Sequence, residues 1–159
     1  MPRLEEVLEL TGGRIGLNIH IYGVGAGGGM IKRVCDLVRQ NALTDIAYLS
    51  LGSEDALRIA RDYAPEVSRS CLVRQDDSSE SIAIAKRYEC QRIQFFRQVT
   101  SGQIWQAHEN GLICNLFWSD DPEEGIRYVQ NGIDVILTNC AHTMLSGGFN
   151  ALQGVPVNK

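Results

Sequence analysis

The sequence contains no run of about 18 consecutive apolar residues, the minimum for a membrane-spanning helix. Its first ten residues, MPRLEEVLEL, are charged and lack the apolar core of a secretory signal peptide. Positive charge is not in excess, because 15 Lys and Arg against 19 Asp and Glu give a net charge of −4. Nucleic-acid-binding proteins usually carry a basic patch. We therefore expect no transmembrane segment, no secretion signal and no nucleic-acid partner.

Closely spaced cysteines are also absent. The five cysteines are scattered along the chain without a C-x-x-C pair, at Cys35, Cys71, Cys90, Cys114 and Cys140. This pattern is typical of buried, reduced thiols, which favours a cytoplasmic location. The length of 159 residues, with 44% hydrophobic and 21% charged residues, is that of one globular domain with a real core.

Short apolar segments alternate with helix-like segments along the chain. The strand-like segments begin near residues 14, 46, 69, 91, 112 and 134, so after the first step they are roughly 22 residues apart. Each such strand returns through a helix and must lie parallel to its neighbour. The strands read as apolar on both faces, as in a sheet covered by helices. A doubly wound open sheet and part of a (β/α)₈ barrel both fit.

The predicted helices carry clear N-terminal signals. Ser53 is a capping residue, and three further segments have the capping-box pattern: Asp77-Ser-Ser-Glu80, Thr100-Ser-Gly-Gln103 and Asp121-Pro-Glu-Glu124. His108 lies near the end of one predicted helix, and we interpret it as a residue that helps to end that helix.

A glycine-rich loop follows the first predicted strand. Gly23-Val-Gly25-Ala-Gly27-Gly28 fits the pattern G-x-G-x-x-G of dinucleotide-binding folds, and Glu54 or Asp55 lies near the position of the acidic ribose ligand. Two other interpretations remain open. The loop is a turn that needs backbone freedom, or the N–H groups of its glycines hold a phosphate, at Gly25, Gly27 and Gly28.

Polar and aromatic residues follow the predicted strands. In parallel βα folds, the carboxyl ends of the strands carry the functional side chains. His20 is a candidate metal ligand through its neutral imidazole, and Tyr22 points to the same side of the strand. The structural alternative for His20 is a buried, hydrogen-bonded strand histidine. No pair of carboxylates stands at two converging strand ends, so Mg²⁺ or Ca²⁺ would find few ligands here.

Further candidates follow the later strands. A guanidinium group suits a phosphodiester, so Arg74 and Arg97 are candidate phosphate-binding residues. Alternatively such arginines are solvated or pair with a nearby carboxylate, that of Asp76 or Asp77. Trp118 either packs against a glycerol or alkyl group or belongs to the core.

Three segments resemble glycerophosphodiester phosphodiesterases. PRLEEVLELTGGRIGLNIHIY resembles the family stretch P-x-L-E-E-V-L-E … L-N-I-E-I-K, and IAYLSLGSEDALRIARDYAPEV resembles a family strand followed by a helix ending in Pro. IWQAHENGLICNLFWSDDPEEGIRYVQNGIDVILTN resembles the closing pattern, with His-x-x-Gly-Leu at a helix end and a last strand Gly-Val-Asp-Gly-Ile-Ile-Thr-Asp. The match runs from about Pro2 to Asn139 and is most specific from Ile104 to Asn139.

The resemblance implies an α/β fold, an incomplete (β/α)₈ TIM barrel with about six βα units and parallel strands. Residues 1–145 would form this partial barrel and residues 146–159 a flexible C-terminal tail. The implied activity is phosphoric diester hydrolysis in lipid and glycerophosphodiester metabolism. The family's His-Arg-Gly and Glu-x-Asp segments have no counterpart here, so we expect a truncated chain that is weakly active or inactive alone.

The resemblance also implies site residues. The metal-binding glutamate of the family aligns with His20, the lysine two residues later with Tyr22, and the final aspartate with Asn139. It implies a divalent metal cofactor, Mg or Ca, whose presence here stays open because the residues at these positions differ. It also implies a small-molecule ligand, a glycerophosphodiester or another phosphate-bearing compound. The resemblance implies Tyr22, Trp118 and Asn139 as substrate-binding positions. Together with the strand-end arginines Arg74 and Arg97, they are the predicted substrate-binding residues.

Open sheet edges in an incomplete barrel also predict a homo-oligomer that covers them. Two alternatives remain beside the phosphodiesterase interpretation. One is a non-catalytic binder of a phosphorylated ligand or partner chain, that is, a pseudoenzyme. The other is a Rossmann-like nucleotide-binding domain that uses the loop from Gly23 to Gly28.

Overall fold

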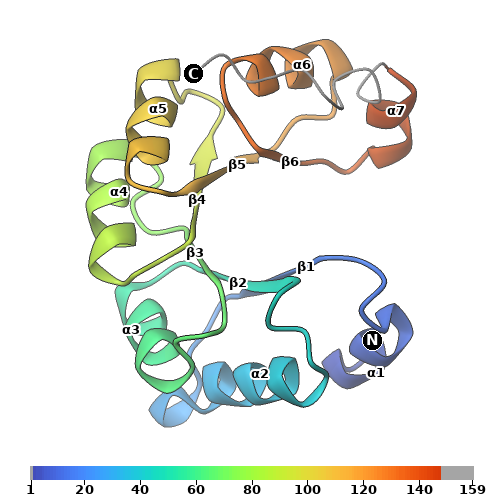
Figure 1. Cartoon of the computed structure of the whole chain (residues 1–159), viewed down its shortest axis with the longest axis vertical. Helices are drawn as coiled ribbons and strands as arrows, with labels where there is room; N and C mark the ends of the chain where they lie inside the picture. Colours follow the sequence, from blue (N-terminus) through green and yellow to red (C-terminus); the bar gives the residue numbers. More distant parts are fainter. Residues whose placement is uncertain (1, 148–159) are drawn as a thin grey trace. The chain divides into compact units, whose positions relative to one another are not determined.

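The computed structural model describes residues 2–147, in which helices and strands alternate (Figure 1). Their order is α1 (Leu4–Thr11), β1 (Leu17–Ile21), the 3₁₀ turn η1 (Ala26–Gly28), α2 (Gly29–Gln40), β2 (Ala47–Leu51), α3 (Glu54–Tyr63), β3 (Arg69–Cys71), α4 (Ser78–Arg87), β4 (Arg92–Phe96), α5 (Ser101–Glu109), β5 (Ile113–Phe117), α6 (Pro122–Gln130), β6 (Val135–Leu137) and α7 (Ala141–Ser146). Within the described part, residues 2–73 and 84–91 form a first compact unit, and residues 74–83 and 92–147 form a second.

Each unit contains three parallel strands in the order of the chain. In the first unit β1 pairs with β2 and β2 with β3, and in the second β4 pairs with β5 and β5 with β6. Neither unit shows the reversal of strand order that defines a doubly wound sheet. The prediction of an incomplete (β/α)₈-type fold with six parallel strands is confirmed.

In the first unit, one face of the sheet is apolar and the other polar. Leu49 and Leu51 are fully buried. α2 and α3 lie on one side of the sheet of this unit (Figure 1). The alternate positions are polar, because Asn18 and His20 of β1 stand beside Tyr48 and Ser50 of β2 in the register. The expectation of strands that are apolar on both faces is therefore wrong for this unit.

The second unit repeats the arrangement. Ile93, Phe95 and Leu116 are fully buried. α5 and α6 lie on one side of the strands of this unit (Figure 1). Gln94 of β4 is level with Asn115 of β5 on the opposite face. Polar side chains alternate with the core residues in both units. Gln94 and Asn115 are themselves buried, whereas Asn18 and His20 of the first unit are exposed.

The predicted helix signals are largely confirmed. The Ser53 hydroxyl accepts a hydrogen bond from the backbone N–H of Ala56 at 3.2 Å. Thr100 and Gln103 form the reciprocal capping box at the start of α5. The Asp121 carboxylate accepts the N–H groups of two residues in the first turn of α6, Glu123 and Glu124.

Two capping boxes differ from the prediction in their last residue. Asp77 accepts the backbone N–H of Glu80, but the Glu80 carboxylate pairs with Arg74 instead of returning to the cap. Likewise the Glu124 carboxylate pairs with Arg97. An arginine after the preceding strand attracts each glutamate more strongly than an exposed backbone N–H does.

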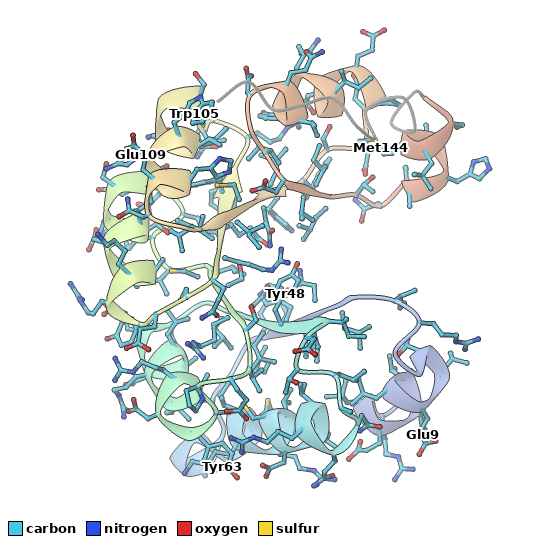
Figure 2. All side chains as sticks on the ribbon, viewed as in Figure 1. Glu9, Tyr48, Tyr63, Trp105, Glu109 and Met144 are labelled. Carbon is cyan, nitrogen blue, oxygen red and sulfur yellow. The ribbon has the colours of Figure 1, made fainter. Side chains whose placement is uncertain are left out.

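Two helices were not evident in the sequence. α1 is formed by the charged start of the chain and buries Leu8, and α7 follows the last strand and buries Met144, labelled in Figure 2. The predicted tail, residues 146–159, lies outside the described residues apart from its first two positions. No helix in the described part of the chain is long and apolar enough to cross a membrane.

A buried arginine ties the first unit together. Arg69 of β3 is only 1% exposed, and its guanidinium donates hydrogen bonds to the backbone carbonyls of Val67 at 2.9 Å, Pro65 at 3.2 Å and Glu89 at 2.8 Å. These carbonyls follow the ends of α3 and α4. Burial lowers the pKa of Arg69. The side chain thus links the segments that follow these two helices.

Candidate functional site

The carboxyl end of β1 carries an aromatic pair. The rings of His20 and Tyr22 stack, with their centroids 4.3 Å apart and 26° between their planes. The prediction that both side chains lie on one side of the strand is confirmed. His20 is exposed and Tyr22 is 92% exposed, so the alternative of a buried strand histidine is wrong. Both rings are accessible to a ligand.

A row of small polar side chains adjoins this pair. Ser50 of β2 is level with His20, and Ser70 of β3 is level with Ser50. The Ser50 hydroxyl donates to Asn18 Oδ1 at 2.6 Å, whereas the Ser70 hydroxyl is buried and has no hydrogen-bond partner within the described residues. An unpaired buried hydroxyl is costly. Ser70 is fully buried, so a ligand does not reach this hydroxyl in this structure.

The residues around His20 do not fit a hard divalent cation. Mg²⁺ and Ca²⁺ take six or more oxygen ligands, mainly from carboxylates. Across residues 2–147, one group of three or more His, Cys, Asp or Glu side chains has its ligand atoms within 4.8 Å of one another, and His20 does not belong to it. The side-chain oxygens of Asn18 and Ser50 are already hydrogen-bonded to each other. A metal at His20 would need ligands from beyond these residues.

The glycine loop has a packing reason for its composition. Gly25, Gly27 and Gly28 have φ values of 70°, 58° and 77°, a region that favours glycine. A Cβ atom on Gly25 would lie 2.9 Å from the backbone nitrogen of Met30, and one on Gly28 would lie 2.9 Å from Ile59 Cδ1. The loop thus allows the start of α2 to approach α3 closely, with or without a phosphate.

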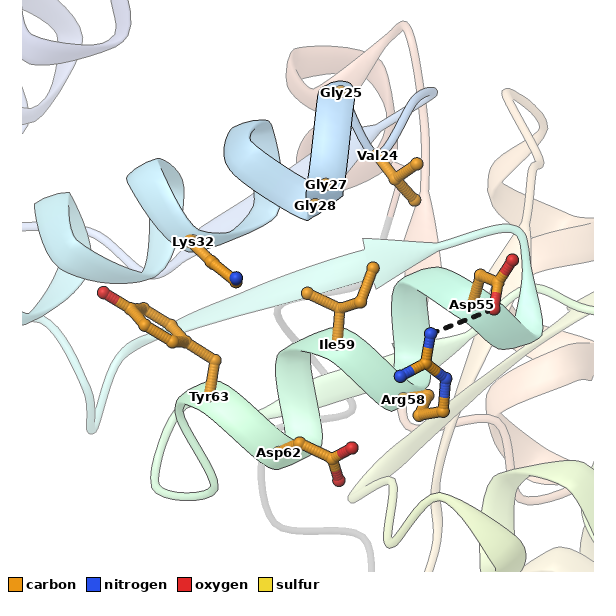
Figure 3. A pocket seen from close by; sticks show the side chains of 10 residues that line it. All are labelled: Val24, Gly25, Gly27, Gly28, Lys32, Asp55, Arg58, Ile59, Asp62 and Tyr63. Carbon is orange, nitrogen blue, oxygen red and sulfur yellow. Dashed lines mark hydrogen bonds and ion pairs between the residues drawn. The ribbon is translucent and has the colours of Figure 1, made fainter.

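The same loop borders a pocket of about 540 Å³ between α2 and α3 (Figure 3). Its charged side chains are Lys32, Arg58, Asp55 and Asp62, and the Arg58 guanidinium bonds to Asp55 at 3.3 Å. Lys32 Nζ lies 5.7 Å from the centre of the Tyr63 ring. Two cations and two carboxylates give a mixed lining, so the phosphate loop at Gly25, Gly27 and Gly28 stays a prediction.

In the second unit, Arg97 and Trp118 meet at the carboxyl ends of β4 and β5. The guanidinium carbon lies 5.5 Å from the centroid of the indole ring, and Nη2 contacts both carboxylate oxygens of Glu124. Trp118 is 38% exposed, so the alternative interpretation, in which this tryptophan belongs to the core, is wrong. The peptide bond between Phe117 and Trp118 is cis.

The carboxylate of Glu124 is shared. It accepts a hydrogen bond from the Ser119 hydroxyl as well as from Arg97, and both lower its pKa, the arginine more. Glu124 in turn raises the pKa of Arg97. The Arg97 side chain remains 49% exposed despite this pair. It can therefore offer its other N–H groups to an anion while Glu124 holds its position.

Asn139 lies against a second carboxylate. Its backbone N–H donates to Asp120 Oδ1 at 2.7 Å and its side-chain amide to Oδ2 at 3.1 Å. The Thr138 hydroxyl donates to Oδ1 at 2.8 Å. These bonds, the Asn139 amide first, lower the pKa of Asp120. Asp120 thus stays ionised and places Asn139 beside the end of β6.

Arg74 pairs with nearby carboxylates, as the alternative to phosphate binding predicted. Its Nε donates to Asp76 Oδ1 at 3.1 Å, and Nη1 lies 2.7 Å from Glu80 Oε2. These carboxylates, Asp76 first, raise the pKa of Arg74. With two carboxylates close by, Arg74 is a weaker candidate for phosphate binding than Arg97.

Sequence reasoning missed the acidic members of the site. Glu124 and Asp120 belong to the segment SDDPEE, which reads first as the start of a helix. Only the fold brings the arginine after β4 and the asparagine after β6 to these carboxylates. The signal in the sequence was an excess of acidic residues, four in six, beyond what one cap needs.

Comparison with solved structures identifies the fold. The chain is similar to glycerophosphodiester phosphodiesterases from Agrobacterium tumefaciens (20% identity, TM-score 0.73, 92% of this chain and 62% of that one) and Parabacteroides distasonis (16%, 0.77, 94% and 65%). It is also similar to an Oleispira antarctica phosphodiesterase in complex with the product sn-glycerol-3-phosphate (18%, 0.79, 92% and 60%). No protein-family model and no curated protein sequence matches.

These structures confirm the family resemblance at the level of the fold. The chain spans 60–65% of the length of the three phosphodiesterases. At 16–20% identity, the match shows the fold alone. Nearly all of this chain is covered, so its fold matches part of each of these longer chains.

Proposed function

We propose that this chain is part of a glycerophosphodiester phosphodiesterase-like domain. Its strand ends bind a glycerophosphodiester or another phosphate-bearing small molecule, and alone it hydrolyses phosphoric diesters weakly or not at all. The observation that carries the proposal is the match of nearly the whole chain to phosphodiesterases, one of them holding sn-glycerol-3-phosphate. The similarity to phosphodiesterases implies the reaction, and the side chains at the strand ends imply that the hydrolysis is weak.

The side chains at the strand ends support the ligand class. Arg97 is held by Glu124 and stays half exposed, so its fork can accept a phosphate without first being ordered. The exposed face of Trp118 beside it suits a glycerol or alkyl group. In the other unit, Tyr22 and His20 offer a flat aromatic surface and a donor. Asn139 contributes an amide that Asp120 positions.

Hydrolysis demands more than these residues supply. A phosphoric diester needs an acid, a base and a positive charge on the transferring group. His20 could serve as acid or base, but Glu124 and Asp120 are each held by hydrogen bonds to their own neighbours. A divalent metal, Mg or Ca, stays part of the proposal only with additional ligands. Weak turnover is the expected consequence.

Hydrolysis of glycerophosphocholine by the purified chain tests the proposal. We expect turnover with Mg²⁺, Ca²⁺, Mn²⁺ or Zn²⁺ to be at or near background. His20→Ala and the exposed control His142→Ala should then behave alike. Metal-dependent turnover that His20→Ala alone abolishes would contradict the expected weakness and place the chemistry on His20.

A second candidate function is a non-catalytic binder, and the paired carboxylates and the metal-poor surroundings of His20 favour it. Calorimetric titration with sn-glycerol-3-phosphate separates the outcomes. Saturable binding without turnover supports the binder. A folded chain that neither binds nor hydrolyses would remove the proposed ligand class. The Rossmann-like alternative gains no support from the strand order.

Two further elements belong to the proposal. β1 and β6 each pair with one neighbouring strand within the described residues, which supports self-association that covers their free edges. Light scattering during gel filtration tests this, and a monomer at high concentration would contradict it.

A cytoplasmic location is the other element, and cell fractionation tests it.

A further inference from the structure

Three chemically different ligand groups converge at the amino ends of β5 and β6. His108 comes from the last turn of α5, Cys114 from β5, and Asp134 from the residue before β6. The imidazole nitrogen, the thiol sulfur and the carboxylate oxygen all lie within 4.8 Å of one another. All three residues belong to the second unit, so the group does not depend on how the units are placed.

Direct contacts already hold two of the ligands in place. His108 Nε2 lies 3.0 Å from Asp134 Oδ2, and the same oxygen accepts the backbone N–H of Cys114 at 2.7 Å. The edge of the Trp105 ring packs against the imidazole, with centroids 6.0 Å apart. His108 therefore has a partner beyond the helix end, which the sequence interpretation did not foresee. The ring is oriented toward the carboxylate by packing from its own helix.

The third ligand is closed off from solvent. Cys114 is fully buried, and its Sγ lies 3.7 Å from the carbonyl oxygen of Leu112 and 3.9 Å from that of Ile104. The side chains of His108 and Asp134 are 23% and 38% exposed. The group is thus covered on the sulfur side and open on the side of the imidazole and the carboxylate. An ion and a water molecule could enter from that open side.

We propose that His108, Cys114 and Asp134 bind a divalent transition-metal ion with the preferences of Zn²⁺. The donor set decides the class of ion, because a thiolate beside an imidazole is unsuited to Mg²⁺ and Ca²⁺ and suits zinc. Zinc lies about 2.3 Å from sulfur and about 2.0–2.2 Å from nitrogen and oxygen, so tetrahedral ligands stand roughly 3.2–3.8 Å apart. A spread within 4.8 Å needs only small side-chain rotations to reach that geometry.

Binding releases one proton. The Cys114 thiol gives its proton to solvent and becomes a thiolate, Asp134 binds as the carboxylate, and His108 binds through the lone pair of neutral Nε2. One thiolate and one carboxylate balance the two positive charges of the ion. A water molecule completes a fourth position on the open side. The site then carries no net charge, which is favourable beside the buried sulfur.

The place of the site in the fold indicates a structural role. The three ligands join α5, β5 and the turn before β6, at the ends of these strands opposite to Trp118 and Asn139. An ion there would link three elements of the second unit without touching the proposed ligand. The inference therefore does not rest on the proposed function, and either can fail alone.

Metal binding by the full chain, produced without a histidine tag, tests the proposal. Equilibrium dialysis against Zn²⁺ should show one ion per chain, and Co²⁺ should give the charge-transfer absorption that marks a thiolate ligand. Zn²⁺ should raise Tm, whereas Mg²⁺ should leave it unchanged. Cys114→Val, which keeps the site apolar and close in volume, should weaken Zn²⁺ binding by roughly 100-fold or more.

A matched control removes the other accessible thiol. Cys140 is exposed, so Cys140→Ser tests binding to a surface cysteine and should leave the stoichiometry and the cobalt spectrum unchanged. Should Cys114→Val fail to fold, Asp134→Asn keeps the shape of the site and should still weaken binding. Absence of saturable Zn²⁺ binding by the folded chain, or a cobalt spectrum without a thiolate band, would overturn the site and leave a hydrogen-bonded cluster.

Discussion

The guanidinium carbon of Arg97 lies 5.5 Å from the centroid of the Trp118 ring, and its Nη2 contacts both carboxylate oxygens of Glu124. Arg97 follows β4, whereas the tryptophan follows β5 and the glutamate belongs to α6. Because the strands are parallel, these three segments meet at the carboxyl ends of β4 and β5. Glu124 thereby holds the guanidinium while about half of the Arg97 side chain stays exposed, which makes Arg97 the strongest candidate for anion binding among the predicted residues.

Replacing Arg97 should therefore weaken phosphate binding. A charge-assisted hydrogen bond contributes about 1.5–3 kcal/mol, so Arg97→Gln should weaken sn-glycerol-3-phosphate binding by roughly 10–100-fold in calorimetry. Arg33→Gln, which removes an exposed ion pair with Glu5, is the matched control and should have no effect. Equal affinity of the two variants would place the ligand elsewhere.

The buried guanidinium of Arg69 should matter for stability. Arg69→Met keeps much of the length of the side chain but leaves the carbonyls of Val67, Pro65 and Glu89 without their donor. We expect the free energy of unfolding in urea to fall by about 3 kcal/mol. Arg33→Met at the surface should change it by less than about 0.5 kcal/mol. Similar values for both would mean that the buried hydrogen bonds contribute little.

Substitutions at two glycines of the loop distinguish the cost of backbone strain from the cost of a steric clash. Gly27 and Gly28 both have positive φ, but a Cβ atom meets Ile59 only at Gly28. Gly27→Ala should cost about 1 kcal/mol, and Gly28→Ala about 1–3 kcal/mol more. Pairing Gly28→Ala with Ile59→Ala should recover part of that difference in denaturant unfolding. Equal costs at the two glycines would show that the approach of α2 to α3 is not tight.

Asp120 should make the second unit sensitive to acid. Asn139 and Thr138 hold the pKa of Asp120 below its ordinary value of 3.8. A lowered pKa in the folded state means stability that is present above about pH 3.8 and is lost as pH falls through the folded pKa. In Asn139→Ala, an NMR titration should show the pKa of Asp120 moving up toward its ordinary value. An unchanged titration would mean that other contacts lower it.

The fold class was largely readable from the sequence. A strand-like segment recurs at nearly regular intervals, and a parallel sheet of βα units follows from that periodicity because each strand must return through a helix. Local signals act over three or four residues, so Ser53 and the Thr100–Gln103 box were predicted correctly. α1 was not predicted, although Leu4, Val7 and Leu8 have the i, i+3, i+4 spacing of an amphipathic helix, because the helix is only eight residues long.

The site was only partly readable. The sequence placed His20 and Tyr22 on one side of their strand, because a period of two is a local property. It did not indicate that the second carboxylates of two capping boxes, Glu80 and Glu124, would turn to arginines on other elements. Such a choice depends on which strong partner is close, and that distance exists only after folding.

By itself the sequence determined the alternation of strands and helices, the starts of most helices, and the residues that follow each strand. These properties depend on neighbours within a few positions. Tertiary structure decided which of those residues meet: Arg97 with Trp118, Asn139 with Asp120, and His108 with Cys114 and Asp134. Asn139 and Asp120 are 19 residues apart in the chain, and His108 and Asp134 are 26 apart. The parallel pairing of β4, β5 and β6 brings these distant side chains into contact.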